Sequence, residues 1–329
     1  MAPSMQSIVI TGGAGFIGGH VATHFLKLGF KVICIDDLSS GTQENIDRLK
    51  SLGKDLFTLF QGNINDRAVV KKALEYATTV DCVGCVHLAA KVSVPLLNEH
   101  PELAISDNVI GFDIVLSECH RSNIPRFVYA SSSAVYGDQK VLPIPETANL
   151  GPTNVYGWSK LSNEVSASAY LDDPDFGVVG LRFFNVFGPN QDPNGPYAAV
   201  IPRWIEAACA GEDINIFGDG LNTRDFISVQ EITDFIHHLI KPDTNLRHSI
   251  FNVGRGRATD LNELAQIMQN IAGTMNNKIN VTYTSARTGD IKHSVADTSR
   301  MQSLLTTRNE TRSLRDDFQT LAAAKNAAT

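Results

Sequence analysis

The sequence contains no long hydrophobic run, and its 28 basic residues are outnumbered by 35 acidic ones. A membrane-spanning helix needs about 20 consecutive apolar residues, so we expect no association with a membrane. The formal net charge of −7 provides no basic field for a phosphate backbone, which argues against nucleic acid as a partner. The first residues also lack the basic and apolar segments of a secretion signal, and we expect a cytoplasmic protein.

Cysteine is scarce, and its five positions are an odd number scattered along the chain. This distribution argues against a disulfide framework and favours reduced thiols. Cys82 and Cys85 have the spacing of a redox or metal pair, but they lie in an apolar run, residues 80–90, without a second pair elsewhere. His20 and His24 are four residues apart, yet no acidic residue stands between them as in metalloprotease helices. We therefore expect a buried strand at the cysteine pair and no metal site.

Short β-branched runs alternate with helical stretches over the first half of the chain, which is typical of a parallel sheet covered by helices. We predict an α/β fold with a Rossmann-like, doubly wound parallel sheet. The expected strands are residues 7–11, 31–36, 56–61, 82–88, 126–130 and 178–182. The expected helices are residues 16–28, 66–76, 109–122 and 156–170.

The pattern changes after Arg182, where Pro, Asn and Gly become frequent between residues 188 and 196. Short mixed elements follow, with a helix expected at residues 201–210. We predict a first domain of residues 1–182 and a smaller C-terminal α/β domain of residues 183–329, from which a segment of about 225–250 returns to the first domain.

The first expected strand ends in a glycine-rich segment, residues 11–18, and a helix follows at once. In such a segment Gly12 permits a tight turn, Gly15 lets the backbone approach a pyrophosphate, and Gly18 lets the helix pack on the strand. The N-terminus of the helix offers free N–H donors and a partial positive charge. A glycine pattern alone is weak evidence, but its position between a strand and a helix predicts a dinucleotide site.

Asp36 ends the second expected strand about 20 residues further on, where an acid would hold an adenosine ribose. A carboxylate accepts hydrogen bonds from ribose hydroxyls and repels a 2′-phosphate, so NAD is favoured over NADP. The alternative is an ordinary capped turn over residues 36–41.

Tyr156 and Lys160 are four residues apart and thus share one face of an expected helix. A tyrosine has an ordinary pKa near 10, and a neighbouring ammonium and a positive nicotinamide ring both favour its phenolate. Such pairs also occur on many surface helices. This one follows the strand at residues 126–130, whose end carries the serine-rich segment 131–137, and ligands of open α/β sheets bind at such ends. A serine hydroxyl there would reach the reacting oxygen.

With these features the sequence resembles the extended short-chain dehydrogenase/reductase family, and within it the UDP-sugar 4-epimerases, especially those that act on N-acetylhexosamines. The resemblance covers nearly the whole chain. It rests on motifs in the family's order, namely TGGAGFIG, IDDLSSG, HLAAKVSV, YASSSAVYG, YGWSK, LRFFNVFGPNQDPNG, AAVIP, IFGDGLNTRDF, FNVG and TGDIKHSVAD. It assigns NAD to the first domain and the UDP-sugar mainly to the second, and it implies a homodimer built from paired helices.

The resemblance implies that Tyr156 is the catalytic base, Lys160 its partner and Ser132 the proton-relaying hydroxyl, with Ser133 as an open alternative to Ser132. The implied cofactor contacts are Gly12, Gly15, Phe16, Ile17, Gly18, Asp36, Asn63, Ile64, Ala89, Lys91, Asn108, Tyr156 and Lys160. Two of these positions differ from the rest. Asn63 stands where the family usually has Asp, and Lys91 fits a solvated lysine nearly as well as a ligand contact.

The implied reaction interconverts UDP-GlcNAc and UDP-GalNAc, with UDP-glucose and UDP-galactose as further substrates, through a transient 4-keto sugar and a retained NAD. The implied substrate contacts are Ser132, Ser133, Asn185, Val200, Arg224, Arg287, Asp290 and Ser294. Ser294 occupies a position where enzymes limited to UDP-glucose and UDP-galactose carry a bulky aromatic, so it leaves room for an N-acetyl group. The preference between acetylated and non-acetylated sugars stays open.

Two other functions compete with epimerisation. Related dehydratases carry an Asp-Glu pair just after the catalytic hydroxyl and related decarboxylases keep the Glu, whereas this chain has Ser133 and Ala134 there. Elimination would lack its acid/base group. Another nucleotide-sugar oxidoreductase or decarboxylase nevertheless remains an alternative, and so does a non-catalytic NAD-binding protein.

Overall fold

The computed structural model describes residues 5–193, 199–241, 246, 248–286, 291–305 and 312–327. Its contacts divide the chain into two units. Unit 1 comprises Met1–Gly137, Asn149–Arg182 and Gln230–Phe251, and unit 2 comprises Asp138–Ala148, Phe183–Val229 and Asn252–Thr329. The sequence-based boundary after Arg182 coincides with a change of unit, whereas Asp138–Ala148 lies in unit 2 although the sequence-based domains placed it in the first.

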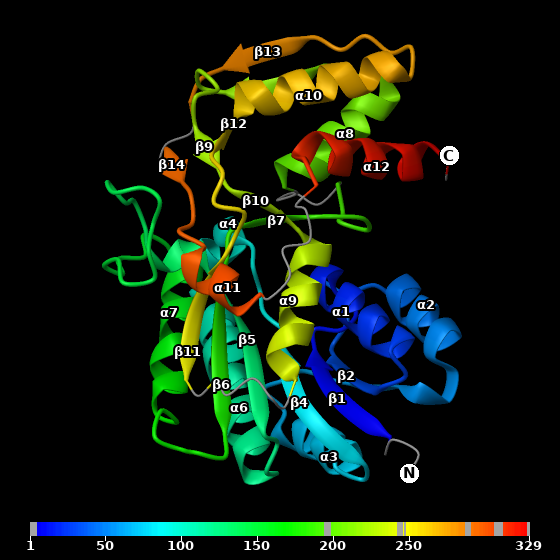
Figure 1. Ribbon diagram of the computed structural model, residues 1–329, viewed down its shortest axis with the longest axis vertical. Coiled ribbons are helices and arrows are strands. Elements are labelled where there is room, and N and C mark those ends of the chain that lie inside the picture. The colour runs from blue at the N-terminus through cyan, green and yellow to red at the C-terminus, as the bar shows by residue number, and fades with distance from the viewer. Residues whose placement is uncertain are drawn as a thin grey trace. The chain divides into compact units, whose positions relative to one another are not determined.

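Unit 1 is built on a seven-stranded sheet (Figure 1). Its strands, in spatial order, are β11 (Ser249–Val253), β6 (Gly177–Phe183), β5 (Arg126–Ser132), β4 (Asp81–His87), β1 (Gln6–Thr11), β2 (Lys31–Asp36) and β3 (Phe57–Gln61). The pairs from β3 through β5 are parallel. The order reverses between β1 and β4, and open α/β sheets bind their ligands at such a switch point. The predicted Rossmann-like fold class is confirmed.

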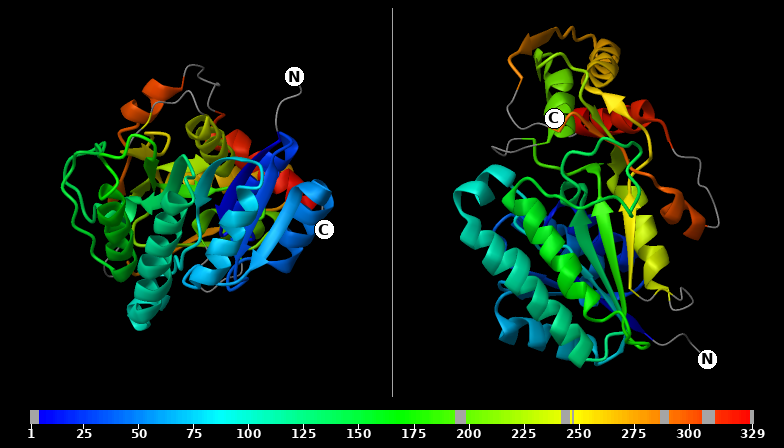
Figure 2. Two further views of the ribbon diagram at one scale, coloured as in Figure 1. Left: turned by 90° about the horizontal axis from the view of Figure 1, so that it is seen from below. Right: turned by 90° about the vertical axis from the view of Figure 1, so that its left-hand side faces the viewer.

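Helices cover both faces of the sheet, as the two further views show (Figure 2). A hydrophobic cluster joins the sheet to one group of helices, namely α3 (Arg67–Ala77), α6 (Phe112–Arg121) and α7 (Val155–Ser168). The other group comprises α1 (Phe16–Lys27), α2 (Gln43–Gly53) and α9 (Val229–Ile240). The strands in the middle are buried on both sides, which explains why they are continuous apolar runs such as Ile8, Val9 and Ile10.

All six strands that the sequence predicts are present, and so are the predicted helices, with one change. The helix expected at residues 109–122 is preceded by α4 (Val94–Glu99) and α5 (Pro101–Leu103) and begins as a π-helix, Ala104–Gly111, before α6 continues it. Cys82 and Cys85 lie buried in β4, as expected, and all five cysteines are free thiols. The seventh strand, β11, is an addition that the sequence analysis did not predict.

Unit 2 contains small sheets and three longer helices. The strand pairs are β7 (Asn185–Phe187) with β10 (Phe226–Ser228), β8 (Ile214–Phe217) with β13 (Val281–Thr284), and β9 (Thr223–Arg224) with both β12 (Thr259–Asp260) and β14 (His293–Ser294). The helices α8 (Val200–Ala210), α10 (Leu261–Thr274) and α12 (Leu314–Asn326) enclose an apolar core, and α11 (Ser299–Leu304) is short. Among the described residues no helix combines the length and the apolar composition that crossing a bilayer requires.

Candidate active site

The glycine-rich segment after β1 forms a turn in which side chains have no room. Gly12 has a φ of +70°, a left-handed conformation that favours glycine, and its N–H donates to Ile35 O at 2.9 Å. A Cβ atom on Gly18 would lie 2.0 Å from the carbonyl oxygen of Gly12. The turn and the first residues of α1 therefore approach each other as closely as the sequence predicts for a phosphate-binding loop.

The N-terminus of α1 is open to an anion. Gly15 is the N-cap, no side chain caps the helix, and no acidic residue stands in its first turn. The N–H groups of Phe16, Ile17 and Gly18 have no partner within the helix, because the first turn of any α-helix leaves them free. A Cβ atom on Gly15 would meet only Gly12 O, at 3.3 Å. This cradle fits the pyrophosphate of a dinucleotide.

Asp36 connects the end of β2 to the glycine turn. One carboxylate oxygen accepts the Ala14 N–H and the other accepts the Leu38 N–H, both at 2.8 Å. Burial raises the pKa of Asp36, and these two hydrogen bonds lower it. Asp36 thus both caps its own turn, at residues 36–41, and lies beside the glycine loop, so the two interpretations of this residue do not exclude each other. Each oxygen retains a lone pair for a ribose hydroxyl.

Two of the other predicted cofactor residues at this edge make contacts within the protein. The Asn63 amide donates to Asp37 at 2.9 Å and accepts the Asn65 N–H at 3.0 Å. Lys91 contacts the hydroxyl of Ser39, and its Nζ lies 3.7 Å from the Asp107 carboxylate. Asn63 therefore shapes the loop beside Asp36. Lys91 links Ser39 to Asp107 and is not a solvated lysine.

Asn108, in the π-helix, holds the loop after β4 against α7. Its side chain accepts the Lys91 N–H at 2.8 Å, donates to Lys91 O at 2.9 Å, and donates to the Ser159 hydroxyl at 3.0 Å. Nearby, Ile64 is buried and the Ala89 N–H donates to the Thr11 hydroxyl at 3.2 Å. The structure thus brings these predicted residues to the carboxyl edge of β1, β2 and β4.

The helix α7 carries both predicted catalytic side chains on one face. Asn154 caps it by accepting the Gly157 N–H at 2.8 Å, and a Cβ on Gly157 would lie 2.7 Å from Ala134 O. The small residue allows the helix to approach the segment after β5 closely. Lys160 is 2% exposed, donates to Ala130 O at 3.0 Å, and its Nζ lies 5.9 Å from the centre of the Tyr156 ring.

The pKa directions correct one part of the sequence-based account. Burial raises the pKa of Tyr156, and a hydrogen bond with Ser132 only partly offsets this effect. Burial also lowers the pKa of Lys160 to about 8. The ammonium therefore does not by itself bring the pKa of the phenol below its ordinary value, because desolvation is the largest influence on that pKa.

Ser132 stands at the end of β5 and contacts Tyr156, which favours it over Ser133 as the relaying hydroxyl. Its Oγ also accepts the Ala134 N–H at 3.2 Å and so caps the 3₁₀ turn Ser133–Val135. Ser133 begins that turn. The serine, the tyrosine and the lysine form one polar group at the carboxyl end of β5.

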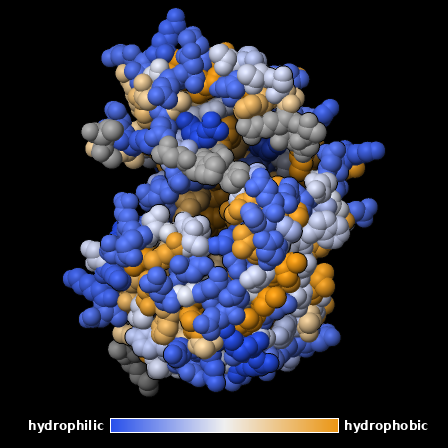
Figure 3. All heavy atoms as spheres, turned by 180° about the vertical axis from the view of Figure 1, so that it is seen from behind, coloured by the Kyte–Doolittle hydropathy of each residue, from blue (hydrophilic) through white to orange (hydrophobic). Residues whose placement is uncertain are grey.

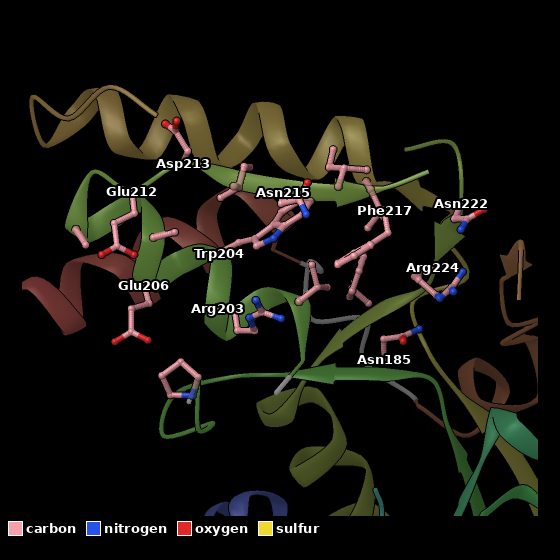
Figure 4. A pocket seen from close by; sticks show the side chains of 18 residues that line it. Asn185, Arg203, Trp204, Glu206, Glu212, Asp213, Asn215, Phe217, Asn222 and Arg224 are labelled. Carbon is pink, nitrogen blue, oxygen red and sulfur yellow. The ribbon is translucent and has the colours of Figure 1, made fainter. Parts of the chain in front are cut away.

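Unit 2 contains a cavity of about 730 Å³ between α8 and the β8 strand (Figure 4). Asn185, Val200 and Arg224, three of the predicted substrate residues, line it. Asn185 is held by Asp225, whose carbonyl oxygen accepts the Asn185 backbone N–H at 2.9 Å and its side-chain amide at 3.1 Å. The other residues of the wall were not predicted from the sequence, among them Arg203, Trp204, Phe217 and Asn222. Phe217 directly precedes Gly218-Asp219-Gly220, the one local signal that pointed to it.

Ser294 and Arg224 are register partners of the parallel strands β14 and β9. Ser294 is buried, and Arg224 donates to Thr223 O at 2.9 Å. Next to them, the buried Asp225 accepts the N–H groups of Arg255, Gly256 and Ala296 at 2.8 to 3.1 Å. Arg287 and Asp290, which the sequence analysis also assigned to the substrate, lie outside the described residues.

Metal-binding residues do not gather in the part of the chain that the structure describes. His24 of α1 instead pairs with His237 of α9, with 3.0 Å between their ring nitrogens. Burial lowers the pKa of both histidines. Two imidazoles supply too few ligands for a structural zinc site, so the pair is a contact between helices.

A glycine turn with an open helix N-terminus, an acid after the second strand, and a Ser-Tyr-Lys group on a doubly wound sheet define an extended short-chain dehydrogenase/reductase. A model of the NAD dependent epimerase/dehydratase family matches residues 8–254, and the chain belongs to that family. Its cofactor is accordingly NAD, which the cradle at Gly12–Gly18 fits.

Similar proteins carry epimerase names. A UDP-glucose 4-epimerase of Mycolicibacterium smegmatis is 31% identical over 298 residues, which are 90% of this chain and 91% of the relative. A solved UDP-N-acetylglucosamine 4-epimerase from Methanobrevibacter ruminantium, in complex with UDP-N-acetylmuramic acid, is 33% identical with a TM-score of 0.88 and covers 99% of this chain and 100% of its own. A UDP-glucose 4-epimerase from Thermotoga maritima with UDP-glucose is 29% identical with a TM-score of 0.85, covering 98% and 99%.

Proposed function

We propose that this protein is a UDP-sugar 4-epimerase that interconverts UDP-GlcNAc and UDP-GalNAc, with UDP-glucose and UDP-galactose as further substrates. The observation that carries the proposal is the contact of Tyr156 with Ser132 beside the buried Lys160. This group lies at the sheet edge that also holds the dinucleotide cradle. The names of the similar proteins support the same activity.

Tyr156 would take the proton of the sugar's 4-hydroxyl, with Ser132 hydrogen-bonded to the same oxygen. The Gly12–Gly18 cradle and Asp36 would hold NAD, whose nicotinamide would supply reversible hydride exchange at C4, so the sugar would undergo no net oxidation. Lys160 keeps its ammonium on Ala130 O at 3.0 Å, which orients the positive charge near the phenol. Because burial raises the pKa of Tyr156, the positive charge of the bound cofactor is needed to favour the phenolate.

The cavity in unit 2 would receive the uridine diphosphate. Arg224 supplies a cation for the diphosphate, and Asn185 supplies amide contacts from a side chain that Asp225 holds. By family resemblance, Arg287 and Asp290 would add a second cation and a ribose contact.

The small side chain of Ser294 supports acceptance of an N-acetyl group. Replacing Ser294 by Tyr adds an aromatic ring at a buried position, so we expect turnover of UDP-GlcNAc to fall by about 100-fold while UDP-glucose turnover changes by less than about threefold. Initial rates with both sugars measure this ratio, and Ser294→Ala is the matched control. Unchanged UDP-GlcNAc turnover in Ser294→Tyr would refute the pocket argument.

A nucleotide-sugar oxidoreductase or decarboxylase is the main alternative. Ser133 and Ala134 provide no carboxylic acid beside Ser132, which disfavours dehydratase and decarboxylase chemistry. Incubation with UDP-GlcNAc and no added NAD distinguishes the classes. We expect UDP-GalNAc as the product, whereas net accumulation of NADH or release of CO₂ would contradict epimerisation.

A homodimer is also proposed, because apolar side chains remain exposed on α7 and the π-helix packed against it. Trp158 is 57%, Val165 65% and Ile105 59% exposed. Figure 3 shows hydrophobic residues grouped on the surface of unit 1. A second copy of this chain is the expected occupant of the α7 surface.

The cytoplasm is the proposed compartment, since all five cysteines are free thiols.

A further inference from the structure

The helix that carries Tyr156 and Lys160 bears a third polar residue on the same face. Glu164 follows Lys160 by four residues, so the three side chains line one side of α7 on successive turns. Glu164 is only 5% exposed. A buried carboxylate is costly unless it is paired, and its partners therefore reveal what it fixes.

The partners of Glu164 come from the two neighbouring strands. One oxygen accepts the Ser131 hydroxyl at 2.6 Å and Arg182 Nε at 2.9 Å, and the other accepts Arg182 Nη2 at 2.7 Å. Arg182, in β6, also donates to the Tyr136 hydroxyl at 2.8 Å and lies over that ring at 4.8 Å. All four side chains are buried. The bidentate pair therefore joins α7 to β5, β6 and the segment after β5.

These contacts fix the position of the end of β5 relative to α7. Three consecutive strand residues are each bound to a different turn of the helix, because Ala130 O accepts from Lys160, Ser131 donates to Glu164, and Ser132 bonds to Tyr156. Apolar packing tolerates small sliding and rotation, whereas a bidentate charged pair has one geometry. The ion pair thus sets the rotation of α7 about its axis.

We propose that Glu164 and Arg182 are positioning residues, which hold α7 in the rotation that keeps the Tyr156 hydroxyl against Ser132. They act through Ser131 and the helix and do not touch the substrate. The kinetic part of this inference rests on the proposed epimerase activity. A second test, an optical titration of the Tyr156 hydroxyl, is independent of that activity.

Three variants separate positioning from stability. Glu164→Gln leaves the Arg182 cation without its carboxylate, and we expect both a loss of stability and a fall in kcat. The double variant Glu164→Met with Arg182→Met removes one positive and one negative charge together. It should regain the stability that Glu164→Gln loses, through apolar packing. Asp317→Asn is the control, because it breaks another largely buried ion pair, with Arg255 in unit 2 at 2.6 Å.

The positioning account expects the double variant to unfold like the wild type in urea and yet to keep a kcat about 10 to 100-fold low, with KM changed less than about threefold. Asp317→Asn should lose stability and keep its kcat. Recovery of kcat together with stability in the double variant would show a merely structural pair and overturn the proposal.

The second readout is ionisation of Tyr156, taken as the difference in tyrosinate absorbance between each protein and its Tyr156→Phe counterpart. The double variant carries no change in net charge. Loss of the Ser132 hydrogen bond should therefore raise the pKa of Tyr156 further. An unchanged titration would overturn the positioning role whether or not the epimerase assay gave turnover. Absence of turnover in the wild type would instead refute the proposed function.

Discussion

At the scale of single residues, Lys160 shows a conflict between stability and activity. Its ammonium is 2% exposed and has one carbonyl partner, so burial lowers its pKa from the ordinary 10.5 to about 8. The folded state thus disfavours the charge that the proposed chemistry needs. Natural proteins retain such groups at functional sites and are stabilised by the rest of the fold.

Lys160→Met should therefore have a pH-dependent effect on stability. The lowered pKa costs the wild type folding free energy in full below pH 8, and this cost fades as the pH rises toward 10.5. Between pH 7 and pH 10 we expect the stability of the variant relative to the wild type to fall by about 2 kcal/mol. Urea unfolding at both pH values, with equal NAD, measures the change. A difference independent of pH would contradict the charged, buried state of Lys160.

The sequence located side chains whose arrangement is local. The spacing of Tyr156 and Lys160 on one helix singled out that pair, the family resemblance added Ser132 at the end of one strand, and the structure brings the three together. Glu164 and Arg182 were not foreseen, because their pairing joins residues 18 apart through tertiary packing, which no periodic pattern encodes. The net pKa direction of Tyr156 also depends on burial and could not be read from spacing.

At the scale of elements, the contact between the glycine turn and α1 decides whether a dinucleotide is held. Gly18→Ala would place a Cβ atom 2.0 Å from the backbone oxygen of Gly12, so the helix must move away from the turn. We expect the purified variant to retain less than about one tenth of the NAD found in the wild type. Absorbance and chromatography of the released cofactor measure its content.

Gly273→Ala is the matched control, since a Cβ atom there meets nothing within 4 Å and the residue lies in α10. It should retain the wild-type NAD content. Full retention of NAD by Gly18→Ala would show that the close approach is not required.

Long apolar strands were predictable, and short paired ones were not. The six predicted strands are runs of five to seven residues, buried over most of their length in all but β3, whereas β9, β12 and β14 have two residues each and exist only through their neighbours. The π-helix before α6 was likewise invisible, because its sequence has ordinary helical periodicity.

At the scale of the whole molecule, the exposed apolar surface of α7 should govern assembly. Trp158→Glu places a charge on that surface, so we expect a dimer of the wild type to become a monomer at micromolar concentration. Sedimentation velocity measures the mass. Leu52→Glu, at an exposed apolar position on α2, is the control and should leave the dimer intact. A monomeric wild type would refute the homodimer.

The domain plan could be read only partly from the sequence. The composition change after Arg182 lies at a change of unit, and the expected return of a segment of about 225–250 lies close to Gln230–Phe251 of unit 1, but the chain also crosses at Asp138 and Asn149. Such crossings depend on which loops pack where, and the sequence around residue 138 carries no shift in composition that would reveal them.

The central claim is that one phenol, Tyr156, moves the proton during inversion at C4 of a UDP-sugar. The most direct test follows UDP-GlcNAc by proton NMR in purified wild type and Tyr156→Phe, with no NAD added and with equal bound NAD confirmed in both. The account predicts UDP-GalNAc formation by the wild type and at least about a 1,000-fold slower reaction in the variant. Equal turnover in the two proteins, or no epimerisation by a wild type that holds NAD, would contradict it.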